Sequence, residues 1–214
     1  MKICKIITQS GDMMDTSKIK KGLKNPVASF NYLFLILNGF YYKLKYSVSM
    51  KNVQIGKNFK VRGRLSIKGP GKVTIGDKVL IDGSSTPVTP WTYSKTAEIR
   101  IGDNTFLNGT RFGCKRKIEI GDNCIVADCR ILDTDFHSIL PHKRHDPEAI
   151  QSEPIKIGKN VWLALDCVIL RGVTIGDNST ISARSVVYSN VPEYSVYGGN
   201  PAVFIKEVPR NSND

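Results

Sequence analysis

An aliphatic side chain recurs at every sixth position in the C-terminal part of the chain. The series is Ile157, Leu163, Ile169, Ile175, Ile181 and Val187. A period of six fits neither the α-helical repeat of about 3.6 residues nor the alternation of a β-strand. It fits a chain that turns a corner after each short strand, so that three strands complete a triangular coil and stacked coils bury a continuous core. The spacing therefore predicts an all-β fold, a parallel β-helix of hexapeptide repeats.

The step of six extends upstream with interruptions. Its members there are Ile55, Val61, Ile67, Val73, Ile75, Ile81, Ile101, Leu107, Ile120, Val126 and Leu132. Several of them precede a corner that contains glycine and Asn or Asp, as expected where a tight bend needs unusual backbone angles. Residues 82–97 depart from the step and are rich in Pro, Ser and Thr, so we expect a loop there.

A second interruption, residues 138–153, is polar and contains two prolines. A long loop that leaves a regular solenoid is commonly functional. We therefore divide the chain into an N-terminal helical and basic segment (residues 1–52), a β-helix domain (residues 53–208) and a tail (residues 209–214). Residues 203–208 are expected to cover the last coil as a capping helix or strand.

The N-terminal segment contains a short apolar run, residues 32–37, which Asn38 and Gly39 interrupt. A membrane-spanning helix needs about 20 predominantly apolar residues, so this run is too short to span a bilayer. Lysines flank it on both sides: Lys18, Lys20, Lys21, Lys24, Lys43 and Lys45. We expect a helix that packs on the first coil or on a neighbouring subunit. The alternative is peripheral membrane contact through residues 18–46, as in helices that lie in the membrane interface.

The composition indicates in which compartment the protein works and which classes of partner it binds. The 214 residues carry a formal net charge of +12, which suits anionic lipid, nucleic acid or a polyanionic small molecule. Basic residues such as Lys115 and Arg116 lack interleaved aromatic residues, so we expect no nucleic-acid partner. The five cysteines form no C-x-x-C pair, and Cys124 and Cys167 occupy a small position of the hexads, so we expect buried thiols. These features, and a start without a secretory signal, favour the cytoplasm.

Residues 132–137, Leu-Asp-Thr-Asp-Phe-His, carry two carboxylates and a histidine. With Leu132 and Phe136 directed inward, strand alternation would direct Asp133 and Asp135 outward and leave His137 at a corner. A neutral imidazole beside a carboxylate and an ejected loop suits a general base. The alternative is a surface histidine with a bystander carboxylate, and the repeat context favours the base.

Four stretches resemble the hexapeptide-repeat acyltransferases: residues 133–138 (DTDFHS), 154–164 (PIKIGKNVWLA), 172–187 (GVTIGDNSTISARSVV) and 199–202 (GNPA). The resemblance is to sugar O-acetyltransferases related to galactoside and maltose acetyltransferases and to those of bacterial surface polysaccharides. It implies a left-handed β-helix and a homotrimer, with each active site between two solenoids and the 138–153 loop enclosing the acceptor. It also implies direct acetyl transfer from acetyl-CoA to a hydroxyl of a sugar or oligosaccharide, without a metal. Such an acceptor can be lipid-linked, at the inner face of the membrane.

The resemblance assigns the acceptor side of the site residue by residue. His137 matches the catalytic histidine that deprotonates the acceptor hydroxyl. Asn108 matches an asparagine that binds the acceptor near that histidine, and Trp162 begins a corner that faces the reacting groups. Asp133 is expected to contact the acceptor, and Asp135 to orient His137 or to hold a sugar hydroxyl.

The resemblance also assigns the cofactor side. The Leu165 N–H would stabilise the tetrahedral oxyanion, with Ala164 beside the thioester. Ala183 matches a residue that lines the pantetheine arm. Residues expected near the adenine and the phosphates are Asn200, Pro201 and Lys206. The chain departs from the family pattern at Leu165, which replaces a serine, and at Arg184, which replaces a glycine.

Other functions fit parts of the pattern. A metal enzyme of the γ-class carbonic anhydrase type would use His137, His142 and His145, but two of these belong to an irregular loop and zinc needs rigidly placed ligands. A non-catalytic scaffold would be expected to have lost the histidine. N-acetylation of an amino sugar needs the same base and stays an alternative. Cys114 and Cys129 are not expected to act as nucleophiles, because direct attack requires no covalent intermediate.

Overall fold

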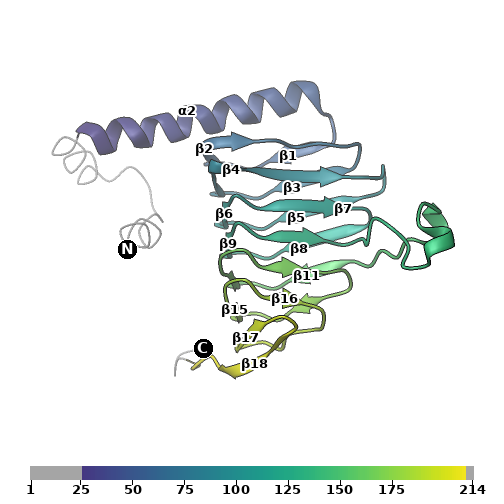
Figure 1. Ribbon diagram of the computed structural model, residues 1–214. Helices are drawn as coiled ribbons and strands as arrows, with labels where there is room; N and C mark the ends of the chain where they lie inside the picture. The colour runs from purple at the N-terminus through teal and green to yellow at the C-terminus, as the bar shows by residue number, and fades with distance from the viewer. Residues whose placement is uncertain (1–25, 211–214) are drawn as a thin grey trace. The chain divides into compact units, whose positions relative to one another are not determined.

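The structure is a computed structural model that describes residues 26–210. Close contacts divide the chain into two units, Met1–Leu35 and Ile36–Asp214, and each is described by itself. The described part of the first unit is the beginning of helix α2 (Pro26–Ser49). The second unit holds the rest of α2 and a stack of short strands (Figure 1).

Three ladders of strands form the sides of a triangular solenoid in the second unit. Side A consists of β1 (Val53–Ile55), β3 (Lys72–Ile75), β5 (Glu98–Ile101), β8 (Lys117–Ile120), β11 (Ile155–Ile157) and β14 (Thr174–Ile175). Side B consists of β2 (Lys60–Leu65), the start of β4 (Leu80–Thr92), β6 (Phe106–Asn108), β9 (Ile125–Ala127), β12 (Trp162–Leu163), β15 (Thr180–Ile181), β17 (Ser195–Gly199) and β18 (Ala202–Glu207). Side C consists of the end of β4, β7 (Arg111–Cys114), β10 (Arg130–Leu132), β13 (Val168–Ile169) and β16 (Val186–Val187).

The chain visits the sides in the order A, B, C and then begins the next coil. Pairing within each ladder is parallel, except that β18 runs antiparallel to β17 at the end of the solenoid. The predicted parallel β-helix is confirmed.

The core repeats once per side and coil. Inward residues stack directly on one another: Ile120, Ile157 and Ile175 on side A, Val126, Leu163 and Ile181 on side B, and Ile131, Ile169 and Val187 on side C. Each of these side chains is at most 1% exposed. Burial of an aliphatic side chain of this size contributes about 1.5–3 kcal/mol. The step of six therefore supplies both the shape of the solenoid and much of its stability.

Polar ladders hold the corner between sides A and B. Asp77 accepts a hydrogen bond from the Lys57 N–H at 2.7 Å, and Asp103 accepts one from the Asp77 N–H at 2.8 Å. Asn104 Nδ2 donates to Asn123 Oδ1 at 2.8 Å. Both asparagines adopt left-handed backbone angles, with φ of 54° and 59°, which Asn tolerates better than most residues. The Asn and Asp residues thus fit the corner role expected from the sequence.

Strand β4 covers residues 82–92 of the stretch 82–97 in which a loop was expected, and only residues 93–97 lie outside the strand. Its start pairs with β6 on side B and its end pairs with β7 on side C, so it turns a corner without leaving the ladders. Val88, Pro90 and Thr92 point inward and are buried, and the Thr92 hydroxyl accepts a hydrogen bond from the Gly71 N–H at 2.8 Å. The expectation was wrong because the Pro, Ser and Thr composition obscures the alternation of these three residues.

One face of the α2 residues in the second unit packs on the first coil. Gly39, Tyr42 and Tyr46 are buried there. The Tyr46 hydroxyl donates to the Leu65 carbonyl at 3.1 Å, and a Cβ at Gly39 would overlap the Phe59 carbonyl. Within residues 26–210, no helix is long and apolar enough to cross a membrane.

Candidate active site

The chain leaves the solenoid after β10 and returns at β11, and His137 lies near the start of this loop. The loop contains two 3₁₀ turns, η2 (Pro141–Lys143) and η3 (Pro147–Ala149), and it projects from the side of the solenoid (Figure 1). The His137 side chain is exposed, and its ring meets that of His145 edge-on, 5.6 Å between centroids. Nowhere in residues 26–210 are three His, Cys, Asp or Glu side chains grouped to hold a metal ion.

Asp133 is a structural residue, which corrects the expectation that it faces outward and contacts the acceptor. Its side chain is fully buried, and its carboxylate accepts hydrogen bonds from the Lys115 N–H at 2.7 Å and the Arg116 N–H at 2.8 Å. Asp133 points inward because the inward residue that follows Val126 is Ile131, five positions further along the chain, where the usual spacing is six. Ile131 is therefore the inward residue of β10, and alternation turns Asp133 inward as well.

Asp135 is held by an arginine of the next coil. Arg171 Nε donates to both carboxylate oxygens of Asp135, each at 2.9 Å, and the Arg171 guanidinium also donates to Glu153 and Gln151. The Asp135 N–H donates to the Gln151 carbonyl at 3.1 Å. In the described structure Asp135 is thus paired with Arg171 and not with His137, so the role of orienting the imidazole through a hydrogen bond is not supported.

The contacts of Arg171 close the base of the loop. Residues 133–135 at its start are joined to residues 151–153 at its end, and the Ser152 hydroxyl donates to Thr134 Oγ1 at 2.8 Å. Arg171 is therefore a positioning residue that sequence reasoning missed. The sequence did contain a sign of this pairing, because Arg171 follows β13 at the same corner at which Asp135 follows β10 one coil earlier.

Phe136 points outward, which corrects its expected inward position, and it joins an aromatic cluster. The Phe136 ring lies over Gly113, where an added Cβ would stand 2.7 Å from Phe136 Cζ. The Tyr93 ring meets Phe136 edge-on with 5.1 Å between centroids, and Trp91 stacks on Tyr93 at 5.0 Å. Trp91 is 40% and Tyr93 43% exposed, and the Lys68 ammonium nitrogen lies over the Trp91 ring, 5.0 Å from its centroid. This cluster was missed from the sequence because residues 82–97 were expected to form a loop.

The expected cofactor residues Ala164 and Ala183 lie at the corner between sides B and C, and so does Asn108, which was expected to bind the acceptor. Asn108 ends β6, Ala164 follows β12 and Ala183 follows β15, so they occupy the same corner of three different coils. The turn that holds Asn200 and Pro201 belongs to this corner too, since the Gly199 N–H donates to Ser185 Oγ at 3.1 Å. Two residues lie further back on side B: Trp162, which is 51% exposed, and Lys206, which pairs with Val196.

The Leu165 amide at this corner is free to donate. The neighbouring Ala164 N–H donates to the Ile181 carbonyl at 2.9 Å, and the Asp166 N–H donates to the Ala127 carbonyl at 3.2 Å. Within the described residues, nothing accepts a hydrogen bond from the Leu165 N–H. An unpaired N–H on an exposed residue is the type of donor that can stabilise an oxyanion.

His137 and the expected cofactor residues lie at opposite ends of side C. Asn108 and Leu165 stand at the corner where the chain enters side C, and His137 stands beyond the corner where it leaves. A strand rises about 3.3 Å per residue, so β7 (Arg111–Cys114) alone separates the two corners by roughly 13 Å. One chain therefore presents these two groups of expected site residues on separate edges, and we call the two groups the half-sites.

A small hollow of about 60 Å³ lies beside Asn108 at the B–C corner, and sequence reasoning did not identify it. Its lining includes Arg111, Arg130, Asp128 and Asp166. Burial raises the pKa of Asp128, and the carboxylates of Asp166 and Asp82 raise it further. Positively and negatively charged side chains therefore line the hollow together.

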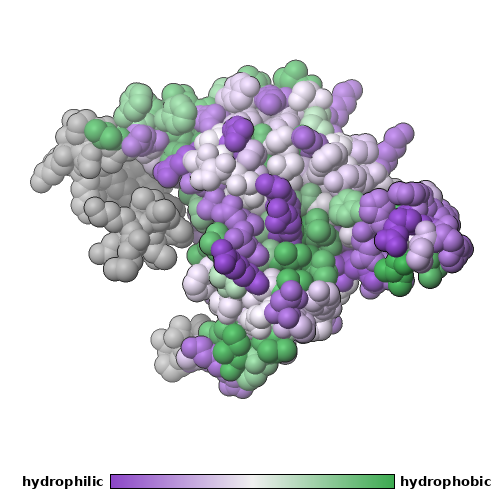
Figure 2. Space-filling model, in the orientation of Figure 1, coloured by the Kyte–Doolittle hydropathy of each residue, from purple (hydrophilic) through white to green (hydrophobic). Residues whose placement is uncertain are grey.

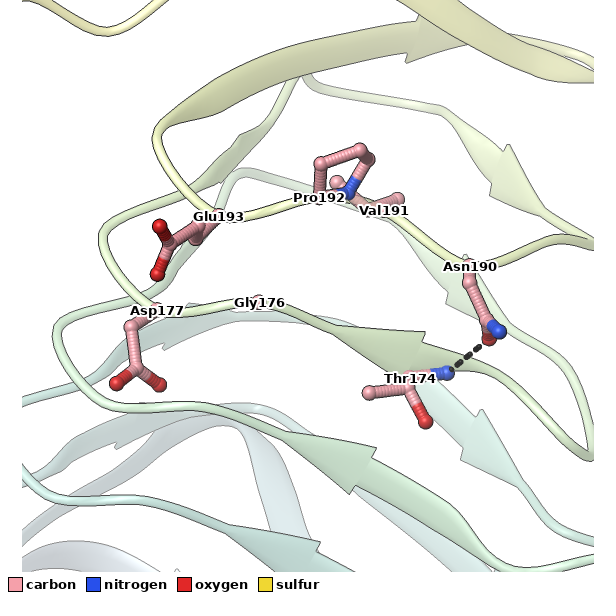
Figure 3. A pocket seen from close by; sticks show the side chains of 7 residues that line it. All are labelled: Thr174, Gly176, Asp177, Asn190, Val191, Pro192 and Glu193. Carbon is pink, nitrogen blue, oxygen red and sulfur yellow. Dashed lines mark hydrogen bonds between the residues drawn. The ribbon is translucent and has the colours of Figure 1, made fainter.

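A larger cavity of about 520 Å³ lies at the last coils, beside β14 (Figure 3). Its lining includes Asp177, Glu193 and Asn190, and Asn190 Oδ1 accepts a hydrogen bond from the Thr174 N–H at 2.7 Å (Figure 3). None of the expected site residues lines it. Its place on side A separates it from both half-sites.

The described cysteines are buried and free, which confirms the expectation for Cys124 and Cys167; Cys4 lies outside the described residues. Burial raises the pKa of the Cys124 thiol to about 11. Burial and the neighbouring Asp133 carboxylate also raise the pKa of Cys114 well above its usual range. Both thiols are protonated near pH 7, as expected for groups that are not nucleophiles.

Known proteins are similar to this chain within the hexapeptide repeats and over a longer part of the chain. The family model for the bacterial transferase hexapeptide, with six repeats, matches residues 154–189. The protein WcaF of Escherichia coli (strain K12), named as a colanic acid biosynthesis acetyltransferase, is 33% identical over 154 residues, which cover 72% of this chain and 69% of WcaF. The galactoside O-acetyltransferase of the same organism is 34% identical over 136 residues, or 63% of this chain and 64% of that enzyme.

A solved structure shares the fold at lower sequence identity. It is AntD, an N-acyltransferase from Bacillus cereus in complex with dTDP and 3-hydroxybutyryl-CoA. The two proteins align with a TM-score of 0.61 and 19% identity over 78% of this chain and 89% of AntD. The stacked coils therefore form a scaffold that is known from other acyltransferases.

Proposed function

Because the chain belongs to the family of hexapeptide-repeat acetyltransferases, we propose that it transfers an acetyl group from acetyl-CoA to a hydroxyl of a sugar in the synthesis of a cell-surface polysaccharide. The two relatives from Escherichia coli, one named for colanic acid biosynthesis and the other a galactoside O-acetyltransferase, support a sugar acceptor. The observation that carries the proposal is the exposed imidazole of His137 on a loop that Arg171 braces.

In this proposal His137 takes the proton of the acceptor hydroxyl while the hydroxyl oxygen attacks the thioester carbonyl. The new C–O bond places negative charge on the carbonyl oxygen, and the unpaired Leu165 N–H donates to it. The C–S bond then breaks, and the leaving thiolate of coenzyme A receives the proton from His137. Holding both substrates in one site adds to the rate by proximity.

The separation of the two half-sites supports a homotrimer with threefold symmetry. In such an assembly the B–C corner of one protomer, with Asn108 and Leu165, would face the C–A corner of its neighbour, with His137. Each of the three seams would then hold one complete site. The coil would be left-handed, as in the resembled family.

The aromatic cluster supports a sugar acceptor. The exposed parts of Trp91 and Tyr93 suit the apolar C–H face of a pyranose ring, since aromatic rings combine a large apolar surface with a polar edge. They lie beside Phe136, the residue that precedes His137. The acceptor would therefore lie between this cluster and Asn108 of the neighbouring protomer, on the cytoplasmic side of a membrane that carries a lipid-linked acceptor.

Thiol release from acetyl-CoA, measured across a panel of sugars, oligosaccharides and their amino derivatives, tests the proposal. We expect release with hydroxyl acceptors, and we expect His137→Ala to lower kcat by about 10²–10⁴-fold with little change in the KM for acetyl-CoA. His142→Ala, in the same loop, is the control. Equal turnover of His137→Ala and the parent would remove His137 from the mechanism, and activity confined to amino sugars would replace O-acetylation by N-acetylation.

A further inference from the structure

The outward face of α2 is apolar although its inward face already packs on the first coil. Within the second unit, six hydrophobic side chains of this helix are more than two-fifths exposed: Ile36 (41%), Leu37 (58%), Phe40 (66%), Tyr41 (56%), Leu44 (54%) and Val48 (78%). Figure 2 shows hydrophobic residues exposed over this helix. We call these six residues the outer face of α2.

The outer face is continuous and is bordered by lysines. At about 100° per residue, its members sweep roughly 140° of the helix circumference, with Ser47 as the one polar residue inside the arc. Lys43 borders the arc on one side and Lys45 on the other. Lys43 Nζ donates to the Gly56 carbonyl at 2.9 Å, and Lys45 Nζ lies 5.3 Å from the Tyr46 ring centroid.

A helix that is apolar on two opposite faces needs cover on both. The first coil covers one face, through Tyr42 and Tyr46. An apolar arc between lysines, on a helix that is not apolar enough to span a bilayer, is the arrangement of helices that lie in a membrane interface. In this structure the Lys43 ammonium contacts the Gly56 carbonyl and the Lys45 ammonium contacts the Tyr46 ring; on docking, their flexible stems would lie along the apolar surface with the charge turned to the headgroups.

The surrounding charge selects an anionic surface. Residues 26–76 contain no Asp or Glu. The same stretch contains nine basic residues: Lys43, Lys45, Lys51, Lys57, Lys60, Arg62, Arg64, Lys68 and Lys72. A second copy of this end of the solenoid would bring like charges together, which disfavours self-association through the outer face. Anionic headgroups would instead gain on the order of 1 kcal/mol per basic residue close to the surface.

We propose that the outer face of α2 docks on the surface of a membrane that contains anionic lipid. Phe40, Leu44 and Val48 enter the interface, and Lys43 and Lys45 lie at the headgroups. This docking requires neither acetyl-CoA nor a sugar, so it stands or fails apart from the acetyl transfer proposed above.

Flotation of the full chain with vesicles tests the docking. We expect binding to vesicles of equal parts phosphatidylcholine and phosphatidylglycerol, weak binding to pure phosphatidylcholine, and release at about 1 M salt, where the Debye length is roughly 3 Å. The double variant Phe40→Asp, Leu44→Asp should bind at least about tenfold less tightly, because two apolar contacts are lost and two like charges are added.

A matched pair of single variants separates docking from general effects. Val48 is 78% exposed on the outer face, and Ile139 is 80% exposed in the loop that carries His137. Val48→Asp should weaken vesicle binding and Ile139→Asp should leave it unchanged, with circular dichroism confirming that both are folded. Equal binding by the two variants would overturn the proposal. So would a change in particle mass by light scattering in the Val48→Asp protein without vesicles, because the face would then be a protein contact.

Discussion

Arg171 Nε donates to both carboxylate oxygens of Asp135 at 2.9 Å, across two adjacent coils of the solenoid. This pair joins the regular ladder to the loop that carries His137, two residues after Asp135. The Asp135 side chain is one-third exposed, so the pair contributes modestly to stability. Its main consequence is geometric, because it fixes the direction in which the loop leaves side C.

Arg171→Ala should lower kcat by about tenfold and change the KM for acetyl-CoA little, because a misplaced base weakens proton transfer while the B–C corner stays intact. Arg171→Lys should restore part of the loss. Steady-state kinetics checks this, with Arg210→Ala as the control, since the ion pair of Arg210 with Glu193 at 3.4 Å lies on the exposed surface. Unchanged kcat in Arg171→Ala would show that the loop is positioned by other contacts.

Asp133→Asn should destabilise the fold by about 1–3 kcal/mol, because the amide would turn an N–H toward a backbone donor that the carboxylate now satisfies. Thermal unfolding should show a lower Tm, with kcat/KM nearly unchanged at low temperature. Asp146→Asn, which alters an exposed turn in the loop, should have little effect. If the Asp133→Asn protein were fully stable but had a raised KM for the acceptor, Asp133 would be a substrate contact after all, contrary to what its burial indicates.

Asp128→Asn should raise stability near pH 7. Burial and the carboxylates of Asp166 and Asp82 raise the pKa of Asp128 in the folded chain, so folding loses stability as pH rises from about 3.9, the ordinary value for aspartate, through the raised pKa. Asparagine removes this charge and tolerates the left-handed φ of 51° at this position. Denaturant unfolding should show a gain that shrinks toward pH 4. A variant less stable than the parent at pH 7 would contradict this explanation.

The ladders could be predicted from sequence because each inward position depends on one residue type at a fixed spacing. Ile157 and Leu163 stack as the step of six requires. The prediction failed where the step changed, because the step of five to Ile131 turns the Asp133 side chain inward when it was expected to point outward. It also failed in β4, where the Pro, Ser and Thr composition hides the alternation of inward residues such as Val88 and Pro90. Register of this kind is set by pairing between coils and not by local sequence.

The candidate site was predictable only in part, for the same reason. His137 and Leu165 are candidates because of motifs that are local in the chain, and their roles stay predictions. The pairing of Asp135 with Arg171 and the stacking of Trp91 near Phe136 join residues that are far apart in sequence, and only the stacking of coils brings them together.

The separation of the two half-sites predicts that two inactive proteins can complement each other. His137→Ala removes the base from the C–A corner, and Ala183→Trp would block the expected cofactor path at the B–C corner. Mixed trimers, obtained by co-expression with two affinity tags, should regain activity because some seams combine an intact corner from each variant. Every trimer that contains both variants has one complete seam among its three, because only one seam joins the intact C–A corner of one variant to the intact B–C corner of the other.

Thiol release by these purified mixed trimers tests the central claim most directly. A site shared between two protomers predicts up to about a third of the parent activity for the mixed trimers, while each variant alone is nearly inactive. Mixed trimers no more active than the separate variants would contradict it, because a site built within one chain could not be completed by a neighbour.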